Sequence, residues 1–200
     1  DVCSSDLIGK ERYNLGLLSA DYRDSFASGI FRHGLTKSLT LEGRAEWSRQ
    51  LQTAGMGANT EIPLLGLGQA ALAISRDAAD LKGTKMLLGV DHQDLSNGFN
   101  ARFIHASRNY RELGFGPTEL PYKAEQAINY RHTFDDKASF GWSMARLVAH
   151  DQTVSRVMTS SYSMRVSERG TLILSGTRVS GNQAGHTVGI SLVLPLDRQR

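Results

Sequence analysis

The strongest constraint on the fold is an alternation of apolar and polar side chains that recurs along the whole sequence. In the segment 39–48 two sets of side chains alternate, one comprising Leu39, Leu41, Gly43, Ala45 and Trp47, and the other Thr40, Glu42, Arg44, Glu46 and Ser48. Successive side chains of a β-strand point to opposite faces, so a period of two residues indicates a strand with one apolar side and one polar side.

The length of these alternating segments limits the choice of fold further. Strands of soluble proteins usually have about 5 or 6 residues, whereas a strand that crosses a membrane needs about 9 to 11. Several segments here have the longer length. The candidate strands are 12–19, 25–33, 39–48, 54–62, 67–76, 85–93, 99–107, 126–134, 139–149, 155–166, 171–179 and 186–194.

Short connections rich in turn-forming residues join nearly all of these segments. Residues 94–98, 135–137, 168–170 and 180–185 have the Gly, Asn and Asp content of hairpin turns. The stretch 109–125, with two prolines and two glycines, suits a longer surface loop. The sequence therefore predicts an all-β chain, an antiparallel meander of about twelve long strands that is part of a transmembrane β-barrel.

Composition is compatible with this fold and excludes some other classes. The chain has 200 residues, of which 40% are hydrophobic, and no run of about 18 apolar residues that could form a membrane-spanning helix. A lipid-facing strand exposes only every second side chain to lipid, so a barrel does not require high mean hydropathy. The net charge of +3 is scattered, without the basic clusters that bind nucleic acid.

The first seven residues differ in character from the rest. Asp1 to Leu7 resemble the in-frame translation of a sequencing-adapter oligonucleotide, and the patterned sequence begins at Ile8. We therefore assign 1–7 as an artefact and 8–200 as one partial transmembrane β-barrel domain. The only cysteine, Cys3, lies in the excluded segment, and a chain without cysteine suits an oxidising periplasm.

Several short motifs carry a resemblance to a known family. They are Arg12-Tyr-Asn-Leu-Gly16, Phe26-Ala-Ser-Gly-Ile-Phe-Arg-His-Gly-Leu-Thr36, Leu39-Thr-Leu-Glu-Gly43, Gly55-Met-Gly57, Gly66-Leu-Gly68 and the closing Val188-Gly-Ile-Ser-Leu-Val-Leu-Pro-Leu196. Together they resemble the barrel of fimbrial outer-membrane ushers of the chaperone-usher pathway. His33 stands where the family pattern has Tyr.

The resemblance implies a central barrel fragment of a larger protein in the bacterial outer membrane. Its partners would be outer-membrane lipid, fimbrial subunits and periplasmic chaperone–subunit complexes, the last two through usher regions that this chain lacks, and not nucleic acid. Family members assemble pili by donor-strand exchange, a form of β-augmentation. The implied function is a segment of pore wall through which subunits are assembled and secreted, without enzymatic activity and without a cofactor.

The strand pattern assigns candidate residues to the two sides of the wall. Charged side chains are costly in lipid, which favours a lumen-facing position for the charged face of 39–48. The candidate lumen-facing residues are Glu42, Arg44, Glu46 and Ser48, and the candidate lipid-facing residues are Leu39, Leu41, Ala45, Trp47, Met86, Leu88 and Val90.

Two enzyme-like motifs compete with this interpretation. Gly66-Leu-Gly-Gln-Ala-Ala71, followed by a possible helix over 70–81 and by Asp91, imitates a dinucleotide-binding unit. Gly141-Trp-Ser-Met-Ala145 imitates a nucleophile elbow around Ser143. Neither has the required helix–strand context, and the histidines lack zinc-site spacing, so we expect no catalytic, cofactor or metal site.

Two alternatives to the usher remain open. Another outer-membrane barrel, such as a porin or an autotransporter translocator, would share every physical feature above. A soluble all-β binding protein would instead be a stable monomer in plain buffer.

Overall fold

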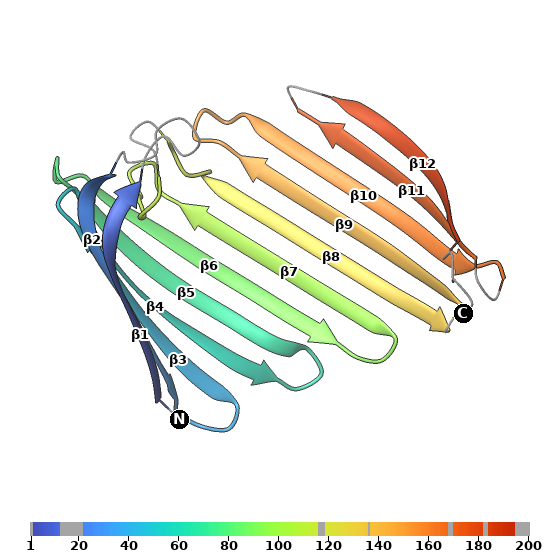
Figure 1. Ribbon diagram of the computed structural model, residues 1–200, viewed down its shortest axis with the longest axis horizontal. Coiled ribbons are helices and arrows are strands. Elements are labelled where there is room, and N and C mark those ends of the chain that lie inside the picture. The colour runs from blue at the N-terminus through green and yellow to red at the C-terminus, as the bar shows by residue number, and fades with distance from the viewer. Residues whose placement is uncertain are drawn as a thin grey trace, which may run out of the picture. The chain divides into compact units, whose positions relative to one another are not determined.

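The alternating segments form long strands that pair in sequence order. The computed structural model describes residues 2–12, 22–115, 119–135, 137–167, 170–181 and 184–194. Within these residues twelve strands form one sheet, hydrogen-bonded in the order β1 to β12 (Figure 1). The pairs whose registers are defined, such as β2 with β3 and β9 with β10, are antiparallel.

The strands have 9 to 13 residues each. Their bounds are β1 Val2–Arg12, β2 Tyr22–Gly34, β3 Leu39–Ser48, β4 Leu51–Ile62, β5 Gly66–Asp77, β6 Lys82–Gln93, β7 Asn97–Ala106, β8 Ala124–Asp135, β9 Ala138–Val148, β10 Val154–Arg165, β11 Thr171–Ser180 and β12 Gly185–Val193. The predicted all-β meander is thereby confirmed, and β3 has the predicted bounds.

Two differences from the prediction concern the start of the chain. The candidate strand 12–19 lies almost entirely outside the described residues, as does most of the motif that begins at Arg12. Residues 2–7, which the sequence argument excluded, form part of β1 and pair with β2, from Val2 opposite His33 to Leu7 opposite Ser28. Backbone pairing requires only an extended segment, so this ladder leaves the origin of residues 1–7 untested.

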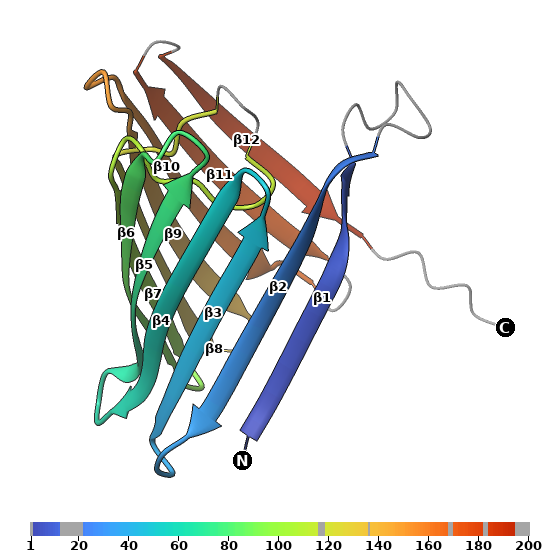
Figure 2. The ribbon, with the colours of Figure 1, turned by 90° about the vertical axis from the view of Figure 1, so that its left-hand side faces the viewer.

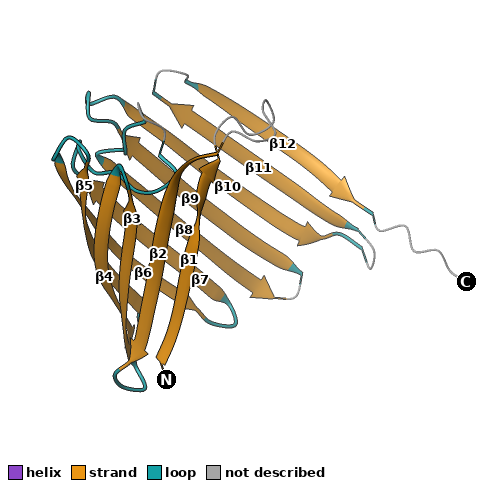
Figure 3. Ribbon diagram, turned by 60° about the vertical axis from the view of Figure 1, so that its left-hand side comes forward, coloured by secondary structure: helices purple, strands orange, loops and turns teal. Residues whose placement is uncertain are grey.

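Neither enzyme-like motif has the local structure that its chemistry requires. Residues 66–77 are strand β5, so the helix of a dinucleotide-binding unit is absent there. Ser143 lies in the middle of β9, whereas a nucleophile elbow needs a sharp turn into a helix. Figure 3 shows strands and loops along the described chain, and none of the described residues belongs to a helix able to span a membrane.

The chain divides into two compact units, which we describe separately. Unit 1 comprises 1–63, 67–88 and 104–123, and unit 2 comprises 64–66, 89–103 and 124–200. In unit 1, strands β3 and β4 lie side by side (Figure 2), with Glu46 opposite Thr53 on one face and Gly43 opposite Met56 on the other. Each pair of opposed residues shares a face, which fixes the sidedness of both strands.

Unit 2 shows the same sidedness with a different chemistry. Its polar face carries rows of small hydroxyl and amide side chains, in which Ser139 Oγ lies 2.8 Å from Ser163 Oγ and Thr159 Oγ1 lies 3.3 Å from Thr177 Oγ1. One cross-strand row on this face runs through Asn129, Ser143, Thr159, Thr177 and Thr187. A row on the opposite face runs through Tyr130, Trp142, Ser160, Gly176 and Val188.

The turn between β6 and β7 shows why hairpin connections could be read from the sequence. The Asp94 carboxylate accepts hydrogen bonds from the backbone N–H of Ser96 at 2.7 Å and of Asn97 at 2.6 Å. The donors of Asn97 and Ser96 favour the charged form and lower the pKa of Asp94 to about 2. The Asp94 side chain thus stabilises the turn, which is the structure that Asp at this position predicts.

We expect Asp94→Ala to lower the unfolding midpoint at pH 7, because two backbone donors lose their acceptor. The folded-state pKa lies below the ordinary value of 3.8, so the stabilisation is complete above about pH 4 and is lost as the pH falls through 2. Thermal unfolding of the unmodified protein and of the variant in detergent, followed by circular dichroism, measures this difference in midpoint. An equal deficit in the variant at pH 7 and at pH 2 would contradict the account.

Candidate functional site

The candidate site in unit 1 is built where the chain between β7 and β8 folds back over the polar face of β3 to β6. We call its described N-terminal part, residues 107–115, the inner loop. Of the buried hydrophobic residues, Leu51, Ile104, Ala106 and Tyr110 belong to unit 1. Tyr110, in the inner loop, is only 3% exposed. The predicted surface loop at 109–125 is therefore wrong for Tyr110, because its ring is covered by the strands beneath it.

The inner loop begins with a pair of reciprocal hydrogen bonds to β6. The backbone N–H of Ser107 donates to the carbonyl oxygen of Thr84 at 2.8 Å. The hydroxyl of Ser107 accepts the N–H of Thr84, also at 2.8 Å. Gly83, next to Thr84, is buried directly beneath Tyr110, and a Cβ at Gly83 would collide with the Tyr110 backbone. Glycine at position 83 thus permits the close approach.

Hydroxyl and carboxylate groups of three strands hold the middle of the inner loop. The backbone N–H of Arg111 donates to Ser75 Oγ of β5 at 2.9 Å, and its carbonyl accepts from Thr53 Oγ1 of β4 at 3.5 Å. The N–H of Leu113 donates to Glu46 Oε2 of β3 at 3.3 Å. Ser75 and Glu46 are each 4% exposed and Thr53 is 9% exposed. These buried polar groups have partners because the loop supplies them.

Glu46 is the most deeply buried charged group of the site. Its side chain is 2% exposed, and its Oε1 accepts a hydrogen bond from the guanidinium of Arg44 while Oε2 accepts the Leu113 N–H. A carboxylate removed from water is costly unless a counter-charge and donors satisfy it. Arg44 and the inner loop together meet that requirement.

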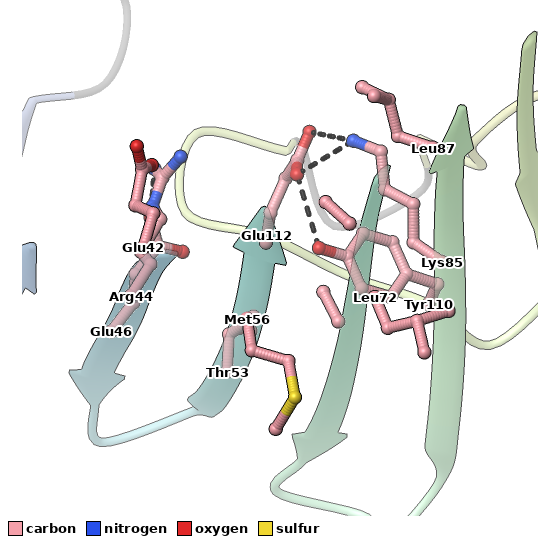
Figure 4. Close-up of a pocket in the computed structure, with 14 residues that line it drawn as sticks. Glu42, Arg44, Glu46, Thr53, Met56, Leu72, Lys85, Leu87, Tyr110 and Glu112 are labelled. Carbon is pink, nitrogen blue, oxygen red and sulfur yellow. Dashed lines mark hydrogen bonds and ion pairs between the residues drawn. The ribbon is translucent and has the colours of Figure 1, made fainter. Parts of the chain in front are cut away.

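A second ion pair joins the inner loop to β6. Lys85 Nζ lies 3.2 Å from Glu112 Oε1 and 3.0 Å from Oε2, and the Tyr110 hydroxyl donates to Oε2 at 3.3 Å (Figure 4). The Lys85 ammonium also lies 5.3 Å from the Tyr110 ring centroid. Burial first, and then the negative charge of Glu112, raise the pKa of the Tyr110 phenol, which keeps it a hydrogen-bond donor.

A cavity of about 270 Å³ remains between the inner loop and the wall. Its charged lining comprises Glu42, Arg44, Glu46, Lys85 and Glu112. The strands contribute the small residues Gly55, Gly57, Ala71 and Ala73 to the same cavity. The space exists because these four positions carry no long side chain. Figure 4 shows the β3 residues on one side of this cavity and the pair Lys85–Glu112 on the other side.

The structure places the predicted residues of β3 as follows. Glu42, Arg44 and Glu46 line the cavity, and Glu42 also accepts a hydrogen bond from Arg32 at 2.6 Å. Ser48 is buried at the β3–β4 turn, where its hydroxyl accepts from the N–H of Leu51 at 3.1 Å. The structure thus brings the first three together and gives Ser48 a structural contact.

The residues assigned to lipid lie on the face of β3 and β6 that is opposite to the cavity. Leu41 is 40% exposed, Trp47 59% and Leu88 46%. Ala45 is exposed, whereas Leu39, Met86 and Val90 are partly covered. Whether this face contacts lipid stays a prediction.

Sequence reasoning missed Thr53, Ser75, Lys85, Tyr110 and Glu112. The available signal was a hydroxyl side chain in a strand whose other residues are mainly small or apolar. Thr53 and Ser75 each belong to the alternating set of positions that forms the polar face of its strand. Their hydrogen-bond partners lie in the inner loop, and the partner of Ser75 is 36 positions farther along the sequence. No local periodicity encodes such a contact. Among the described residues no group of three or more His, Cys, Asp or Glu side chains could hold a metal ion.

Comparison with known proteins identifies no family for this chain. No family model matches the sequence, and no curated protein matches it. Among solved structures, the chain is similar to an outer membrane channel from Pseudomonas putida F1, with 14% identity, a TM-score of 0.39, and coverage of 96% of this chain and 91% of that one.

We expect Gly83→Ala to displace the inner loop, because the added methyl would meet the Tyr110 backbone. Limited trypsin digestion would then cleave faster after Arg108 or Arg111, as mass spectrometry of the fragments would show. Gly43→Ala is the matched control on β3, since a Cβ there has open space within 4 Å. Equal cleavage rates in the two variants would contradict this packing.

Proposed function

We propose that this chain forms part of the wall of an outer-membrane β-barrel pore. In each unit the polar face lines an aqueous lumen and the other face contacts lipid. The observation that carries the proposal is the exposure of large apolar side chains on one face of strands long enough to cross a membrane.

Strand length fits the hydrocarbon thickness. A strand rises about 3.3 Å per residue, so ten residues span roughly 33 Å, against a hydrocarbon core of about 30 Å. The strands have 9 to 13 residues. A tilted strand of this length still reaches from one interface to the other.

The exposed apolar face of unit 1 has no protein layer over it among the described residues. Side chains on this face of neighbouring strands are largely exposed, with Trp47 at 59%, Met56 at 72%, Leu72 at 58% and Ile74 at 62%. Soluble monomers rarely expose contiguous apolar patches of this kind, whereas a lipid-facing wall requires them.

The opposite face of unit 1 has the chemistry of an aqueous lumen. It carries Glu42, Arg44, Glu46 and Lys85, three of which are at least a quarter exposed. An Arg or Lys on the lipid face near the midplane costs about 2–4 kcal/mol. We assign no catalysis, cofactor or nucleic-acid partner to this function, because a passive pore needs none.

The test compares two arginine substitutions on the apolar face of β4. Met56 lies near the middle of the strand, and Gln52 lies near its end on the same face. Met56→Arg should lower the free energy of unfolding in lipid vesicles by about 2–4 kcal/mol, and Gln52→Arg by about 0–1 kcal/mol. Urea titration followed by tryptophan fluorescence measures both.

A soluble protein would behave differently in that experiment. Met56 is 72% exposed, so its replacement in water would change the stability by less than about 0.5 kcal/mol. Equal, small effects of Met56→Arg and Gln52→Arg, together with a stable monomer in plain buffer, would reject the membrane barrel.

Within this class, we infer a fimbrial usher as the specific protein. The support is the sequence resemblance, from the motif at 26–36 to the closing motif at 188–196. The hydroxyl-lined face of unit 2 suits the passage of folded subunits, since it offers hydrogen bonds but few charges for strong adhesion. A porin or an autotransporter translocator is the alternative, and it shares the wall but not the cargo.

We expect a photo-crosslinker at Thr177, on the polar face of unit 2, to capture the fimbrial subunit in cells that assemble fimbriae. The matched control is Val188, which lies on the opposite face and is 79% exposed. Mass spectrometry would identify the adduct. Absence of the subunit at Thr177 during active assembly, or equal capture at Val188, would reject the usher and leave the general barrel.

A further inference from the structure

We propose that the apolar face of unit 2 binds one lipid molecule with a negatively charged phosphate headgroup. The phosphate is held by four basic side chains near one end of neighbouring strands, which we call the basic cluster: Arg146 of β9, Arg156 of β10, Arg178 of β11 and His186 of β12. This inference rests on the proposed function, because it requires that this face contacts lipid. It adds the class of lipid that the wall selects.

The strand registers place the basic cluster on the apolar face of unit 2. Strands β9 to β12 pair in order (Figure 1), and Arg146 lies opposite Arg156, while Arg178 lies opposite His186. Both pairs fall on the same face as Trp142, and each member is at most two positions from the end of its strand. An arginine at this depth can extend its guanidinium along the wall into the headgroup layer.

No carboxylate balances the basic cluster among the residues that the structure describes. None of the ion pairs there involves a member of the cluster. Glu125 of β8 lies on the polar face, and the Asp151 carboxylate accepts the backbone N–H of Thr153 in the β9–β10 turn at 2.9 Å. The one printed partner is neutral, because Arg146 Nη1 donates to Gln126 Oε1 at 3.3 Å.

The spacing within the basic cluster suits a phosphate group. The Cβ atoms of directly opposed residues lie about 4.5–5.5 Å apart, and like charges at such positions destabilise a sheet. Arg178 is a diagonal neighbour of Arg156, at a Cβ distance of roughly 7–8 Å. Guanidinium groups bind phosphate oxygens through paired hydrogen bonds, so one phosphate offsets the repulsion between Arg146 and Arg156.

A shallow hollow adjoins the basic cluster on the same face. It has a volume of about 300 Å³, and its lining includes Arg178 and His186 together with the apolar side chains of Trp142, Met158 and Val188. The hollow therefore joins a basic end to apolar walls, which is the arrangement that an amphipathic anion requires.

A second hollow, of about 270 Å³, extends the first along the strands. The two share Ser160, Gly176 and Val188, and the second is also lined by Phe140, Tyr162, Leu174 and Ile190. The floor is open because a Cβ at Gly176 would meet only Ser160 Oγ within 4 Å, at 3.7 Å. We call the two hollows together the groove.

The groove and the basic cluster together define the ligand as a lipid with net negative charge. An acyl chain that lies in the groove gains apolar contact, while its phosphate reaches the arginines. Free phosphate has no group for the groove. A zwitterionic lipid carries a cation that cancels the attraction to the cluster.

The test uses Trp142, which lines the groove, as a reporter of the lipid beside it. The protein extracted from outer membranes, with the other tryptophan of the sequence replaced by Trp47→Phe, is placed in phosphatidylcholine vesicles. A small fraction of the lipid carries bromine on its acyl chains, which quenches tryptophan fluorescence on contact. This fraction is either phosphatidylglycerol or phosphatidylcholine with the same chains, and the ratio of their association constants at Trp142 is measured.

We expect phosphatidylglycerol to quench Trp142 at a lower content than phosphatidylcholine. Arg156→Gln with Arg178→Gln should lower the ratio of association constants by about 25-fold, because each basic residue beside an anionic lipid contributes a factor of about five. The matched control is Arg131→Gln with Arg165→Gln, which removes the same charge from the polar face of unit 2 and should leave the ratio unchanged. Excess inorganic phosphate should not displace the lipid.

A structural role of the arginines would give a different result in phosphatidylcholine alone. There the variant Arg156→Gln with Arg178→Gln should unfold at the same temperature as the single-tryptophan protein or at a higher one, since the repulsion between Arg156 and Arg146 is removed. A lower unfolding midpoint would assign the arginines to the fold and would overturn the site.

The remaining outcomes separate this inference from the proposed function. Equal quenching of Trp142 by the two brominated lipids, an equal loss in the control variant, or displacement by inorganic phosphate would each overturn the lipid site while the barrel stands. Absence of quenching by either lipid would mean that this face does not contact lipid, and the proposed function would fall together with the site.

Discussion

The pairing of every strand with its sequence neighbour is the constraint on which the rest of this structure depends. In lipid no water is available to hydrogen-bond the backbone, so N–H and C=O groups must find partners within the sheet. Among the described residues, the order β1 to β12 satisfies this on both edges of β2 to β11, while β1 and β12 each pair along one edge. Because the pairing consumes the backbone groups, the side chains are free to divide into an apolar and a polar face.

The inner loop of unit 1 is a consequence of that division. A polar face can accept a segment that brings its own backbone donors, and Glu46 and Ser75 take two of them from Leu113 and Arg111. Small residues such as Gly57 and Ala71 leave room beneath it. The polar face of unit 2 carries rows of hydroxyl side chains instead.

The strands and the charged β3 side of the site were predictable from the sequence, whereas the loop side of the site was not, for one physical reason. The period of two in 39–48 is a local property, and β3 has the expected bounds. Turns such as that of Asp94 are also local. The hydrogen bond between Glu46 and Leu113 joins residues that are 67 positions apart. It depends on the course of a loop, which the alternation of residues within a strand does not predict. The charged face of β3 was predictable from the sequence, but the inner loop that lies over it was not.

The central claim is that the two faces of one strand contact different media. A spin-label scan along β9, Ala138–Val148, tests it most directly, with the one cysteine of the sequence removed by Cys3→Ser and the protein in lipid vesicles. We expect collisions with oxygen, which concentrates in lipid, to be frequent at Phe140, Trp142 and Met144, and collisions with a water-soluble nickel chelate at Ser139, Gly141 and Ser143. Access of the nickel chelate to both sets alike would contradict the barrel.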